Sequence, residues 1–258
     1  MKMMQEIPCS TANLPALFDA AIPNHPILFS ALEGHIKNVV LADAEEQPKQ
    51  AAVRTPDGFI FFSAAASEDF LRSALRRLQL IGPAITVLAG DVRRFPKPDL
   101  ELPRFEFTDL DQESSGIGKD KIELPAGFSL QKMDSGLLAS CEWRGLIELS
   151  YGSVERFLAE SFGFCLMEGE KVVTEAYAAF QGGGAVEIGV ITADSRQGRG
   201  FGGITSARLI QEIEAQGLSA YWSCDQSNTP SVSLARKLGF KTERKYDLYG
   251  YRPLKAPA

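Results

Sequence analysis

One segment of the sequence combines glycines and arginines in a spacing that suits an anion: Arg196-Gln197-Gly198-Arg199-Gly200-Phe201-Gly202-Gly203. A Val- and Ile-rich run that predicts a strand precedes it, and apolar residues at helical spacing follow it. A helix start carries unpaired backbone N–H groups and a partial positive charge. Glycines let an anion approach the backbone, and the two arginines add full charges. The segment is therefore predicted to hold a phosphate or pyrophosphate.

This loop differs from the two common nucleotide-binding loops. No Gly-Lys-Ser or Gly-Lys-Thr follows it, so it is not a P-loop. The spacing of Gly198, Gly200 and Gly202 also departs from the dinucleotide-binding fingerprint at its last glycine. Taken alone, the loop leaves one alternative open, a turn whose glycines only relieve backbone strain.

Composition and charge exclude several classes of protein. The chain has 258 residues, of which 45% are hydrophobic and 23% charged, close to an average globular protein. Its 27 Lys and Arg against 33 Asp and Glu give a net charge of −6, which does not favour nucleic-acid binding. No apolar run approaches the roughly 20 residues of a membrane span, and the first residues do not resemble a signal peptide. We expect a cytoplasmic protein without nucleic-acid or membrane partners.

Few residues are available for metal or histidine chemistry. The cysteines are scattered, and no CxxC or His-x-x-x-His pair occurs, so no metal site is predicted. The two histidines, His25 and His35, lie far from any nucleophile motif. Catalysis by a histidine-activated serine or cysteine is therefore not expected.

Both halves of the chain predict the same order of elements. In the second half, strands are expected at 162–167, 172–180, 185–191, 218–224 and 246–251, with helices at 204–217 and 231–238. In the first half, strands are expected at 35–42, 51–54, 59–63 and 85–88, with a turn at 55–58 and a helix capped by Ser67 that runs through Leu78. Each half has the order β-β-β-α-β, so we hypothesise a diverged internal duplication.

The stretch from Arg94 to Gly127 is interpreted as the connection between the halves. Its Phe95-Pro96-Lys97-Pro98 cannot continue a helix or a central strand. A polar, glycine-bearing segment follows, which is typical of a linker. The boundary is expected near residue 120, which gives domains 1–120 and 121–258.

The second half resembles the GNAT superfamily of N-acetyltransferases. The motifs that carry this resemblance are Gln197-x-x-Gly200-x-Gly202, the strand Glu187 to Thr192 before it, Asn228-x-x-Ser231, and Leu234 to Phe240. The resemblance covers roughly Leu124 to Tyr251. It implies an α/β fold with a mixed, mostly antiparallel sheet flanked by helices. The smaller α/β domain of residues 1–120 would be a degenerate copy.

Within the superfamily, the chain is most similar to the group that includes the zwittermicin A resistance protein. Phe162-Gly163-Phe164-Cys165, Ala185 to Gly189 and Trp222-Ser223-Cys224 carry this closer resemblance. Proteins of that group also have an N-terminal extension like residues 1–120.

The resemblance implies an N-acetyltransferase that uses acetyl-CoA as co-substrate. An amine acceptor, expected to be a small molecule, would attack the thioester directly. The backbone at Ile191 and Thr192 would bind the pantetheine arm. The pyrophosphate would be held by Gln197, Gly198, Arg199, Gly200, Phe201 and Gly202, and Asn228 with Ser231 would approach from the other side. Asn228 has an alternative role as the N-cap of the last helix, and both roles can hold at once.

Glu187 is the predicted general base, because some members of the superfamily use a glutamate on this strand. Buried carboxylates usually have a partner or a raised pKa, which suits a base. The alternative is that strand alternation turns Glu187 towards solvent. The superfamily's usual tyrosine acid is replaced here by Ala235.

Either another side chain protonates the leaving thiolate, or the reaction needs no such donor. The candidates near in sequence are Tyr221, Cys224, Tyr246 and Tyr249. Tyr249 is taken as the predicted catalytic acid. Ordinary packing is the alternative for all four residues.

Two other functions remain open. A non-catalytic acyl-CoA-binding regulatory module is supported by Ala235, and a protein acetyltransferase differs only in its acceptor. The first half runs from Phe59 into its helix without a glycine-rich loop, so it is not expected to bind acyl-CoA. It would instead wall off the acceptor pocket. The sequence names neither the acceptor nor the oligomeric state.

Overall fold

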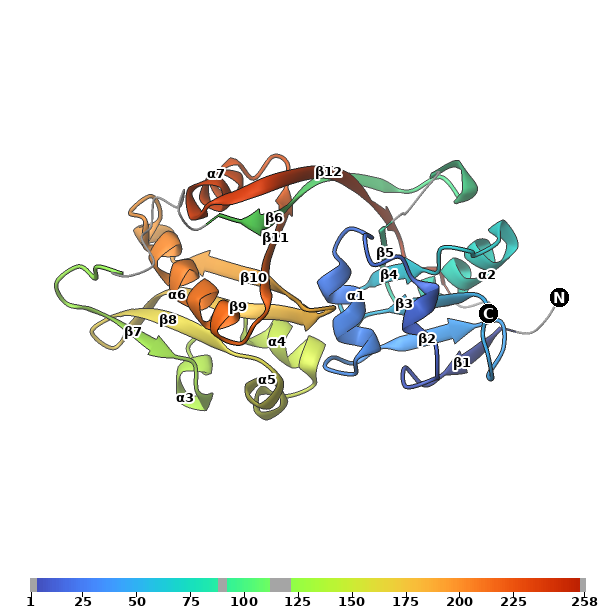
Figure 1. The fold of residues 1–258 in the computed structure, drawn as a ribbon, viewed down its shortest axis with the longest axis horizontal. Helices are drawn as coiled ribbons and strands as arrows, with labels where there is room; N and C mark the ends of the chain where they lie inside the picture. Colours follow the sequence, from blue (N-terminus) through green and yellow to red (C-terminus); the bar gives the residue numbers. More distant parts are fainter. Residues whose placement is uncertain (1–3, 88–91, 112–121, 256–258) are drawn as a thin grey trace. The chain divides into compact units, whose positions relative to one another are not determined.

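The computed structural model describes residues 4–87, 92–111 and 122–255, and the chain divides into two compact units (Figure 1). Unit 1 comprises residues 1–104 and 245–258, and unit 2 comprises residues 105–244. The chain enters unit 2 along β6 (Leu100–Leu110) and returns to unit 1 along β12 (Phe240–Tyr251). The boundary expected near residue 120 lies in 112–121, outside the described residues.

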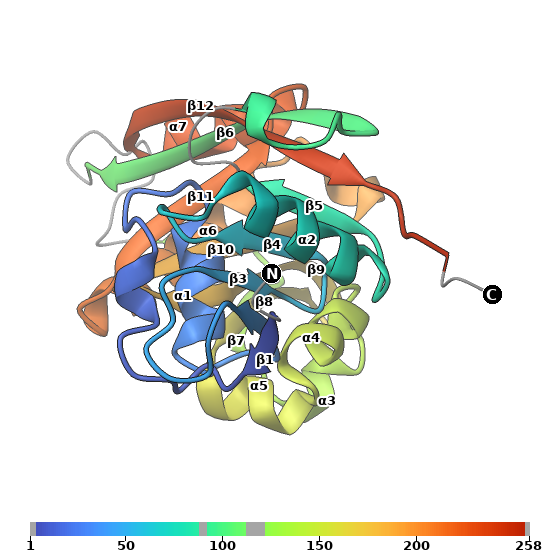
Figure 2. The same cartoon turned by 90° about the vertical axis from the view of Figure 1, so that its right-hand side faces the viewer.

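Unit 1 is an α/β unit. Its elements are β1 (Gln5–Ile7), the 3-10 helix η1 (Pro15–Leu17), α1 (His25–Leu32), β2 (Val39–Ala42), β3 (Ala51–Arg54), β4 (Phe59–Phe62), α2 (Glu68–Gln79), β5 (Ala84–Val87) and the 3-10 helix η2 (Val92–Arg94). The strands are hydrogen-bonded in the order β1-β2-β3-β4-β5-β12, and β4–β5 is the parallel pair in an otherwise antiparallel arrangement. Figure 2 shows α2 lying over this sheet, where it contacts β3 and β5.

Two local predictions for unit 1 are confirmed. The Ser67 side chain accepts a hydrogen bond from the Phe70 N–H at 3.3 Å, so Ser67 caps α2. The turn at 55–58 ends at Gly58, whose φ of +100° requires a glycine.

The strand expected at 35–42 is wrong in its first part, because β2 begins at Val39. Residues before it form a turn after α1, in which the His35 N–H donates to the Ser30 carbonyl. The Asn38 side-chain amide donates to the Ala31 carbonyl at 2.9 Å and holds the turn against the end of the helix. These bonds occupy groups that a longer strand would need.

Unit 2 contains a larger sheet. Its elements besides β6 and β12 are β7 (Phe128–Lys132), α3 (Ser135–Leu138), α4 (Arg144–Tyr151), α5 (Val154–Glu160), β8 (Gly163–Glu168), β9 (Lys171–Gly182), β10 (Ala185–Thr192), the 3-10 helix η3 (Asp194–Arg196), α6 (Phe201–Ala215), β11 (Ser219–Asp225) and α7 (Thr229–Leu238). The strands are hydrogen-bonded in the order β12-β6-β11-β10-β9-β8-β7. The β10–β11 pair is parallel, and β7 to β10 pair antiparallel. This is the mixed, mostly antiparallel sheet with flanking helices that the sequence predicted.

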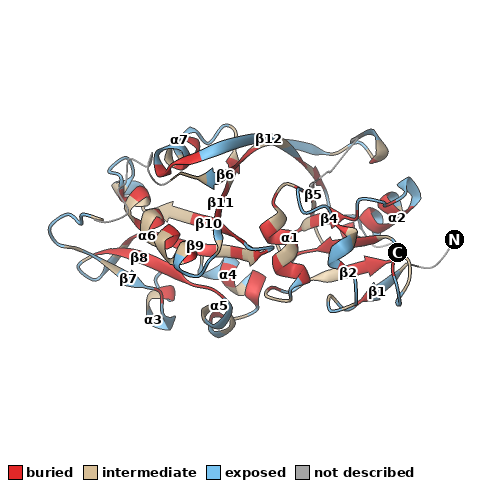
Figure 3. Ribbon diagram, in the orientation of Figure 1, coloured by how far each residue is buried: buried red, intermediate tan, exposed pale blue. Residues whose placement is uncertain are grey.

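The two faces of this sheet have different cores. Helices α6 and α7 cover one face, where Leu209 and Ile213 pack with Ile188 and Trp222. Aromatic rings from α4, α5 and β9 contact one another in a separate cluster that includes Tyr151, Phe157 and Tyr177. Figure 3 shows β8 and β9 buried along most of their length, whereas the first part of β12 is exposed. A side chain on β10 therefore faces either the α6–α7 core or the opposite side.

Part of the predicted connection is a strand. Leu100–Leu110 form β6, which lies between β11 and β12, so the interpretation of Arg94–Gly127 as a linker is wrong for these residues. Phe105 and Phe107 bury their rings in the core of unit 2. Charged residues alternate with these two aromatic residues, so the segment did not have the apolar character of a buried strand. The short helices α3, α4 and α5 were also not predicted.

The repeated order of elements is confirmed. In unit 1, β2-β3-β4-α2-β5 has two antiparallel pairs followed by a parallel pair, and β8-β9-β10-α6-β11 in unit 2 has the same pattern. In both units the helix connects the two parallel strands. None of the described helices has the length and apolar character needed to cross a membrane.

Candidate functional site

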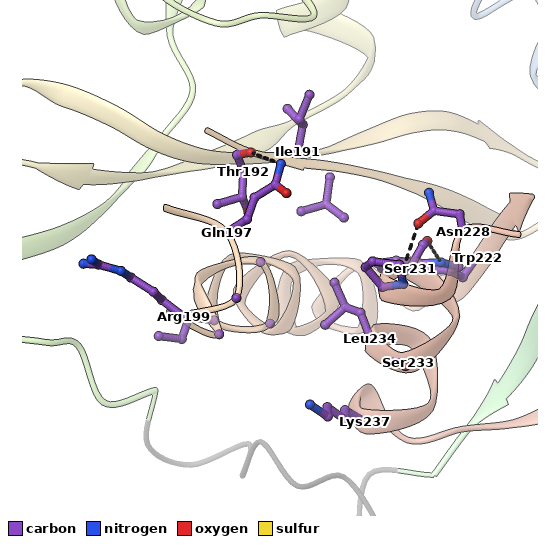
Figure 4. A pocket seen from close by; sticks show the side chains of 17 residues that line it. Ile191, Thr192, Gln197, Arg199, Trp222, Asn228, Ser231, Ser233, Leu234 and Lys237 are labelled. Carbon is purple, nitrogen blue, oxygen red and sulfur yellow. Dashed lines mark hydrogen bonds between the residues drawn. The ribbon is translucent and has the colours of Figure 1, made fainter. Parts of the chain in front are cut away.

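A cavity of about 810 Å³ lies in unit 2 at the end of β10 and the start of α6 (Figure 4). Its walls come from the last residues of β10, the loop before α6, the first turn of α6, and α7. The lining residues are Val190, Ile191, Thr192, Gln197, Gly198, Arg199, Gly200, Gly202, Gly203, Ile204, Trp222, Asn228, Pro230, Ser231, Ser233, Leu234 and Lys237. This volume is within the usual range for a small-molecule site.

The strand side of the cavity begins where two parallel strands stop pairing. The register between β10 and β11 runs from Ala185–Ser219 to Glu187–Tyr221, although β10 continues to Thr192. The register of β10 against β9 shifts between Glu187 and Ile188, as it does at a β-bulge. Bulges bend a strand and increase its local twist. The part of β10 that borders the cavity is Val190–Thr192, where an extended ligand can hydrogen-bond to the backbone as an added strand does.

The loop owes its shape to glycines. Gly198 has φ +75° and Gly200 has φ +81°, both in the left-handed region, and a Cβ would meet open space at either position. Glycine is thus needed for the backbone conformation rather than for room. Gly200 is the N-cap residue of α6, and it has no side chain to cap the first turn. The amides of that turn are left to bind an anion.

The charges around the cavity suit an anion. The described lining residues include Arg199 and Lys237 and contain no carboxylate. Arg196, whose charge the sequence assigned to the same purpose, forms an ion pair with Glu168 instead. The Gln197 side-chain amide donates to the Thr192 carbonyl at 3.2 Å and ties the loop to the end of β10.

Helix α7 forms the opposite wall. Asn228 Oδ1 accepts a hydrogen bond from the Ser231 N–H at 3.2 Å, so the capping role of Asn228 is confirmed. The indole Nε1–H of Trp222 donates to Ser231 Oγ at 3.1 Å. Asn228 and Ser231 both line the cavity, so capping and ligand contact are compatible at this position (Figure 4).

Nine of the ten residues predicted to bind the cofactor line this cavity. The exception is Phe201, whose ring packs against Phe128 at a centroid distance of 4.9 Å with Leu166 and Val173 nearby. Its side chain anchors α6, and only its backbone can serve a ligand.

Sequence reasoning missed several lining residues, among them Trp222, Leu234 and Lys237. The spacing of Leu234 and Lys237, three residues apart on α7, was available as a signal. The part played by Trp222 depends on how β11 and α7 pack.

Glu187 is buried, with 9% of its surface exposed, so the alternative in which it faces solvent is wrong. The Ser223 hydroxyl donates to Glu187 Oε1 at 2.6 Å. Glu187 stands opposite Tyr221 in the β10–β11 register, at the last pair before the strands part. Glu187 is not among the residues that line the cavity, whose β10 wall begins at Val190.

The predicted acid, Tyr249, belongs to unit 1 and is not among the lining residues. It lies on β12 opposite Thr86 and packs against the core of that unit. Partial burial, with the carboxylates of Asp247 and Glu101 nearby, raises the pKa of Tyr249. The phenol therefore stays protonated over a wider pH range, as a proton donor must.

The other donors considered have different surroundings. Tyr221 is buried and its hydroxyl donates to Glu106, which is also ion-paired with Arg244. Cys224 and Ala235 lie in the core beneath α6 and α7, so Ala235 offers no donor at the position of the superfamily's usual tyrosine. Tyr246 donates to Asn24 Oδ1 at 2.7 Å within unit 1.

A buried carboxylate fixes the start of α4 over β10. Glu175 accepts hydrogen bonds from the N–H groups of Glu142 and Trp143 at 3.1 and 2.9 Å. A Cβ on Gly189 would come within 2.5 Å of the Trp143 ring and 2.7 Å of Tyr177. Glycine at 189 therefore lets both rings pack against the strand two residues after Glu187.

In the part of the chain that the structure describes, no three His, Cys, Asp or Glu side chains cluster in a way that could hold a metal ion.

The fold and the cavity together define a GNAT-like α/β protein. The chain belongs to the GNAT acetyltransferase family, whose profile matches residues 16–249. It is 27% identical over 236 residues to an uncharacterized N-acetyltransferase, YdfB, of Bacillus subtilis (strain 168), covering 86% of this chain and 88% of that protein.

Solved structures share the fold across both units. A GCN5-related N-acetyltransferase-like protein from Streptococcus suis 89/1591 aligns with a TM-score of 0.70 at 23% identity, covering 93% of this chain and 97% of that one. A tandem GNAT protein from the clavulanic acid biosynthesis pathway aligns with a TM-score of 0.58 at 10% identity, covering 99% of this chain and all of that one. The latter fits the repeated order of elements seen here. The chain is thus an acetyltransferase of a family that uses acetyl-CoA.

Proposed function

We propose that this chain transfers an acetyl group from acetyl-CoA to the primary amine of a small molecule by direct attack. The observation that carries the proposal is the cavity where β10 and β11 part, with glycine-shaped backbone and cations at its mouth. It combines an exposed strand edge with an anion site at the start of α6, as a long, phosphate-bearing thioester requires.

The residues present fit acetyl-CoA along its length. The β10 edge at Ile191 and Thr192 would bind the pantetheine arm, and the amides from Gln197 to Gly202 would hold the pyrophosphate. Arg199 adds positive charge to that part of the cavity. The absence of carboxylates among the described lining residues avoids repulsion of the phosphates.

The chemistry needs little besides orientation and one proton transfer. Bound acetyl-CoA supplies an activated acyl thioester. Glu187 would take the proton of the attacking amine at its carboxylate, and burial supports this role because low solvation makes a carboxylate a better base. The role of Tyr249 as proton donor stays a prediction from the sequence, because this residue belongs to unit 1 and does not line the cavity; the turnover of a Tyr249→Phe variant tests it.

We propose that residues 1–120 are a degenerate copy that does not bind acyl-CoA, and that 121–258 carry the catalytic site. The shared pairing pattern supports the duplication. In unit 1, β4 stays paired with β5 from Phe59–Ile85 to Phe61–Val87, which is all of β4 except its last residue. The two strands therefore do not part as β10 and β11 do in unit 2. The start of α2 is capped by Ser67 and carries Glu68 and Asp69 in its first turn, an arrangement that repels an anion.

We also propose the closer kinship with the zwittermicin A resistance protein group, and hence an amino-polyol antibiotic or metabolite as acceptor. The support for it is the resemblance of Phe162-Gly163-Phe164-Cys165 to that group, in a segment whose glycine also has a structural reason. A Cβ there would come within 2.4 Å of Met133 Sδ and 2.7 Å of Tyr177 Cβ, so the glycine is required by packing.

The test is thermal melting with acetyl-CoA and with free CoA, followed by a CoA-release assay over a panel of aminoglycosides, polyamines, amino-polyols and peptides. A ligand at about 100 times its dissociation constant adds about 2.7 kcal/mol to stability. Arg199→Glu is expected to blunt the shift, because it places a negative charge at the phosphate site. Lys97→Glu, in unit 1 and exposed, is the matched control that should leave the shift unchanged.

A folded protein whose melt is unmoved by saturating acetyl-CoA and CoA would refute the cofactor site. A shift without turnover of any amine would favour the regulatory binder, which the buried Ala235 supports. Turnover confined to peptides would favour a protein acetyltransferase.

A further inference from the structure

The Glu187–Ser223 hydrogen bond joins β10 and β11 just beyond the last backbone pair between the two strands. Ser223 lies on β11 two residues beyond Tyr221, the last residue paired with β10. The Glu187 side chain therefore reaches forward along the unpaired stretch to meet the Ser223 hydroxyl at 2.6 Å. The bond bridges the two strands at the place where their backbones have ceased to bond.

The polarity of this bond matters for chemistry. A hydroxyl that donates to a carboxylate stabilises the charged form, and charge-assisted hydrogen bonds are shorter and stronger than neutral ones. Ser223 is half-buried and Glu187 is buried, so water screens the bond only in part. Occupying Oε1 in this way also fixes the plane of the carboxylate.

We infer that Ser223 is a positioning residue, which orients the Glu187 carboxylate at the parting of β10 and β11 and keeps it ionised so that it can accept a proton. This inference rests on the proposed function, in which Glu187 is the general base. Ser223 neither lines the cavity nor caps a helix, so the inference gives this residue a role.

Other titratable groups surround Glu187 and have to be held constant. Tyr221 stands beside it on β11, and its hydroxyl is bonded to Glu106 of β6, which Arg244 of β12 neutralises. On β9, Phe180 is the paired residue and Tyr177 lies opposite Gly189. All of these residues are kept in the Ser223 variants.

The first experiment is a carboxyl titration by NMR on full-length protein labelled with ¹³C at the glutamate carboxyl. The Glu187 signal is assigned by its loss in Glu187→Gln. In Ser223→Ala, its titration midpoint should move to higher pH by about one unit, because a bond to the charged form is lost. Ser223→Thr keeps a hydroxyl and should restore the parent midpoint. Ser219→Ala, an exposed serine on the same strand, is the matched control.

An unchanged midpoint in a folded Ser223→Ala protein overturns the inference. A shift that Ser223→Thr does not reverse also overturns it, because the cause would then be repacking rather than the hydroxyl. A downward shift does the same, since the sign would be opposite to that of a lost stabilising bond.

A kinetic readout applies with an amine that the parent acetylates. The acid limb of kcat/KM should move to higher pH in Ser223→Ala and return in Ser223→Thr. An acid limb that stays at the pH of the parent overturns the inference, whatever happens to the rate at high pH.

The two proposals fail in different ways. A shifted midpoint without any amine turnover sinks the proposed function and leaves the Glu187–Ser223 coupling standing. Turnover of an amine together with an unchanged Glu187 midpoint supports the proposed function and overturns the role of Ser223.

Discussion

Replacing Asn228 separates two roles that its position allows. Its Oδ1 accepts the Ser231 N–H at 3.2 Å as the cap of α7, and its side chain also lines the cavity. Removing such a cap costs about 1 kcal/mol, which lowers the melting temperature of a chain of this size by about 2–4 °C. Asn228→Ser should keep most of the cap, because serine caps helices nearly as well as asparagine.

The cofactor role predicts a second effect, seen only with ligand. One lost hydrogen bond is worth about 0.5–1.5 kcal/mol, up to about tenfold in affinity. At an acetyl-CoA concentration of about 100 times the parent's dissociation constant, the ligand's stabilisation would fall from about 2.7 to about 1.4 kcal/mol. Both Asn228→Ala and Asn228→Ser should show this loss, whereas only the alanine variant should melt lower without ligand.

The assay is differential scanning fluorimetry with titrated acetyl-CoA. Ser67→Ala removes a cap of the same kind from α2 in unit 1, where Ser67 accepts the Phe70 N–H, and should lose stability without losing the ligand effect. If Asn228→Ala has the same melting temperature as the parent without ligand, the capping argument is refuted. Variants that keep the full ligand shift would leave Asn228 with capping alone.

Two further predictions concern the loop and the thiols. Gly200→Ala should destabilise the protein by about 1–2 kcal/mol, because Gly200 has φ +81°. Gly145→Ala, within α4, should be neutral or stabilising by about 0.5–1 kcal/mol. Thermal melts that rank the two variants in the opposite order contradict the backbone argument. A hydrogen bond with Cys165 and burial raise the pKa of Cys141 and keep its thiol protonated, so iodoacetamide at pH 8 should label Cys9 in the native protein and all four cysteines only in denaturant. Mass spectrometry that finds Cys141 labelled as fast as Cys9 would contradict this.

The central part of unit 2 could be predicted because its signals are local. Apolar runs separated by glycine-bearing turns gave β8, β9 and β10 within one or two residues of their observed ends. The loop from Gln197 to Gly202 was equally readable, since dihedral need and anion binding depend on neighbouring residues. Nine of ten predicted positions consequently line one cavity.

The missed elements depend on distant partners. Glu106 makes β6 look like a solvated stretch, yet its carboxylate is buried between the Tyr221 hydroxyl and Arg244. Lys237 lines the cavity only because α7 packs beside α6. No local pattern can report such pairings.

The helices α3, α4 and α5 are a different case. They are four to eight residues long, too short for apolar periodicity to register. Their ends were nonetheless marked, because Asp134 and Ser153 cap α3 and α5, and Gly152 with φ +97° ends α4.

The path of β12 bears on how the protein is made. Residues Leu248–Tyr251 pair with Val87–Ala84 and complete the sheet of unit 1, although the whole of unit 2 separates the two strands in the chain. The first unit therefore cannot complete its sheet when residues 1–104 have been synthesised, and it has to wait until unit 2 and β12 have followed. Folding of the second unit can begin earlier, because 105–244 are contiguous. Severing the gene near codon 120 would give an N-terminal fragment with β5 as an open edge, a template for aggregation that a separate C-terminal peptide would have to cover.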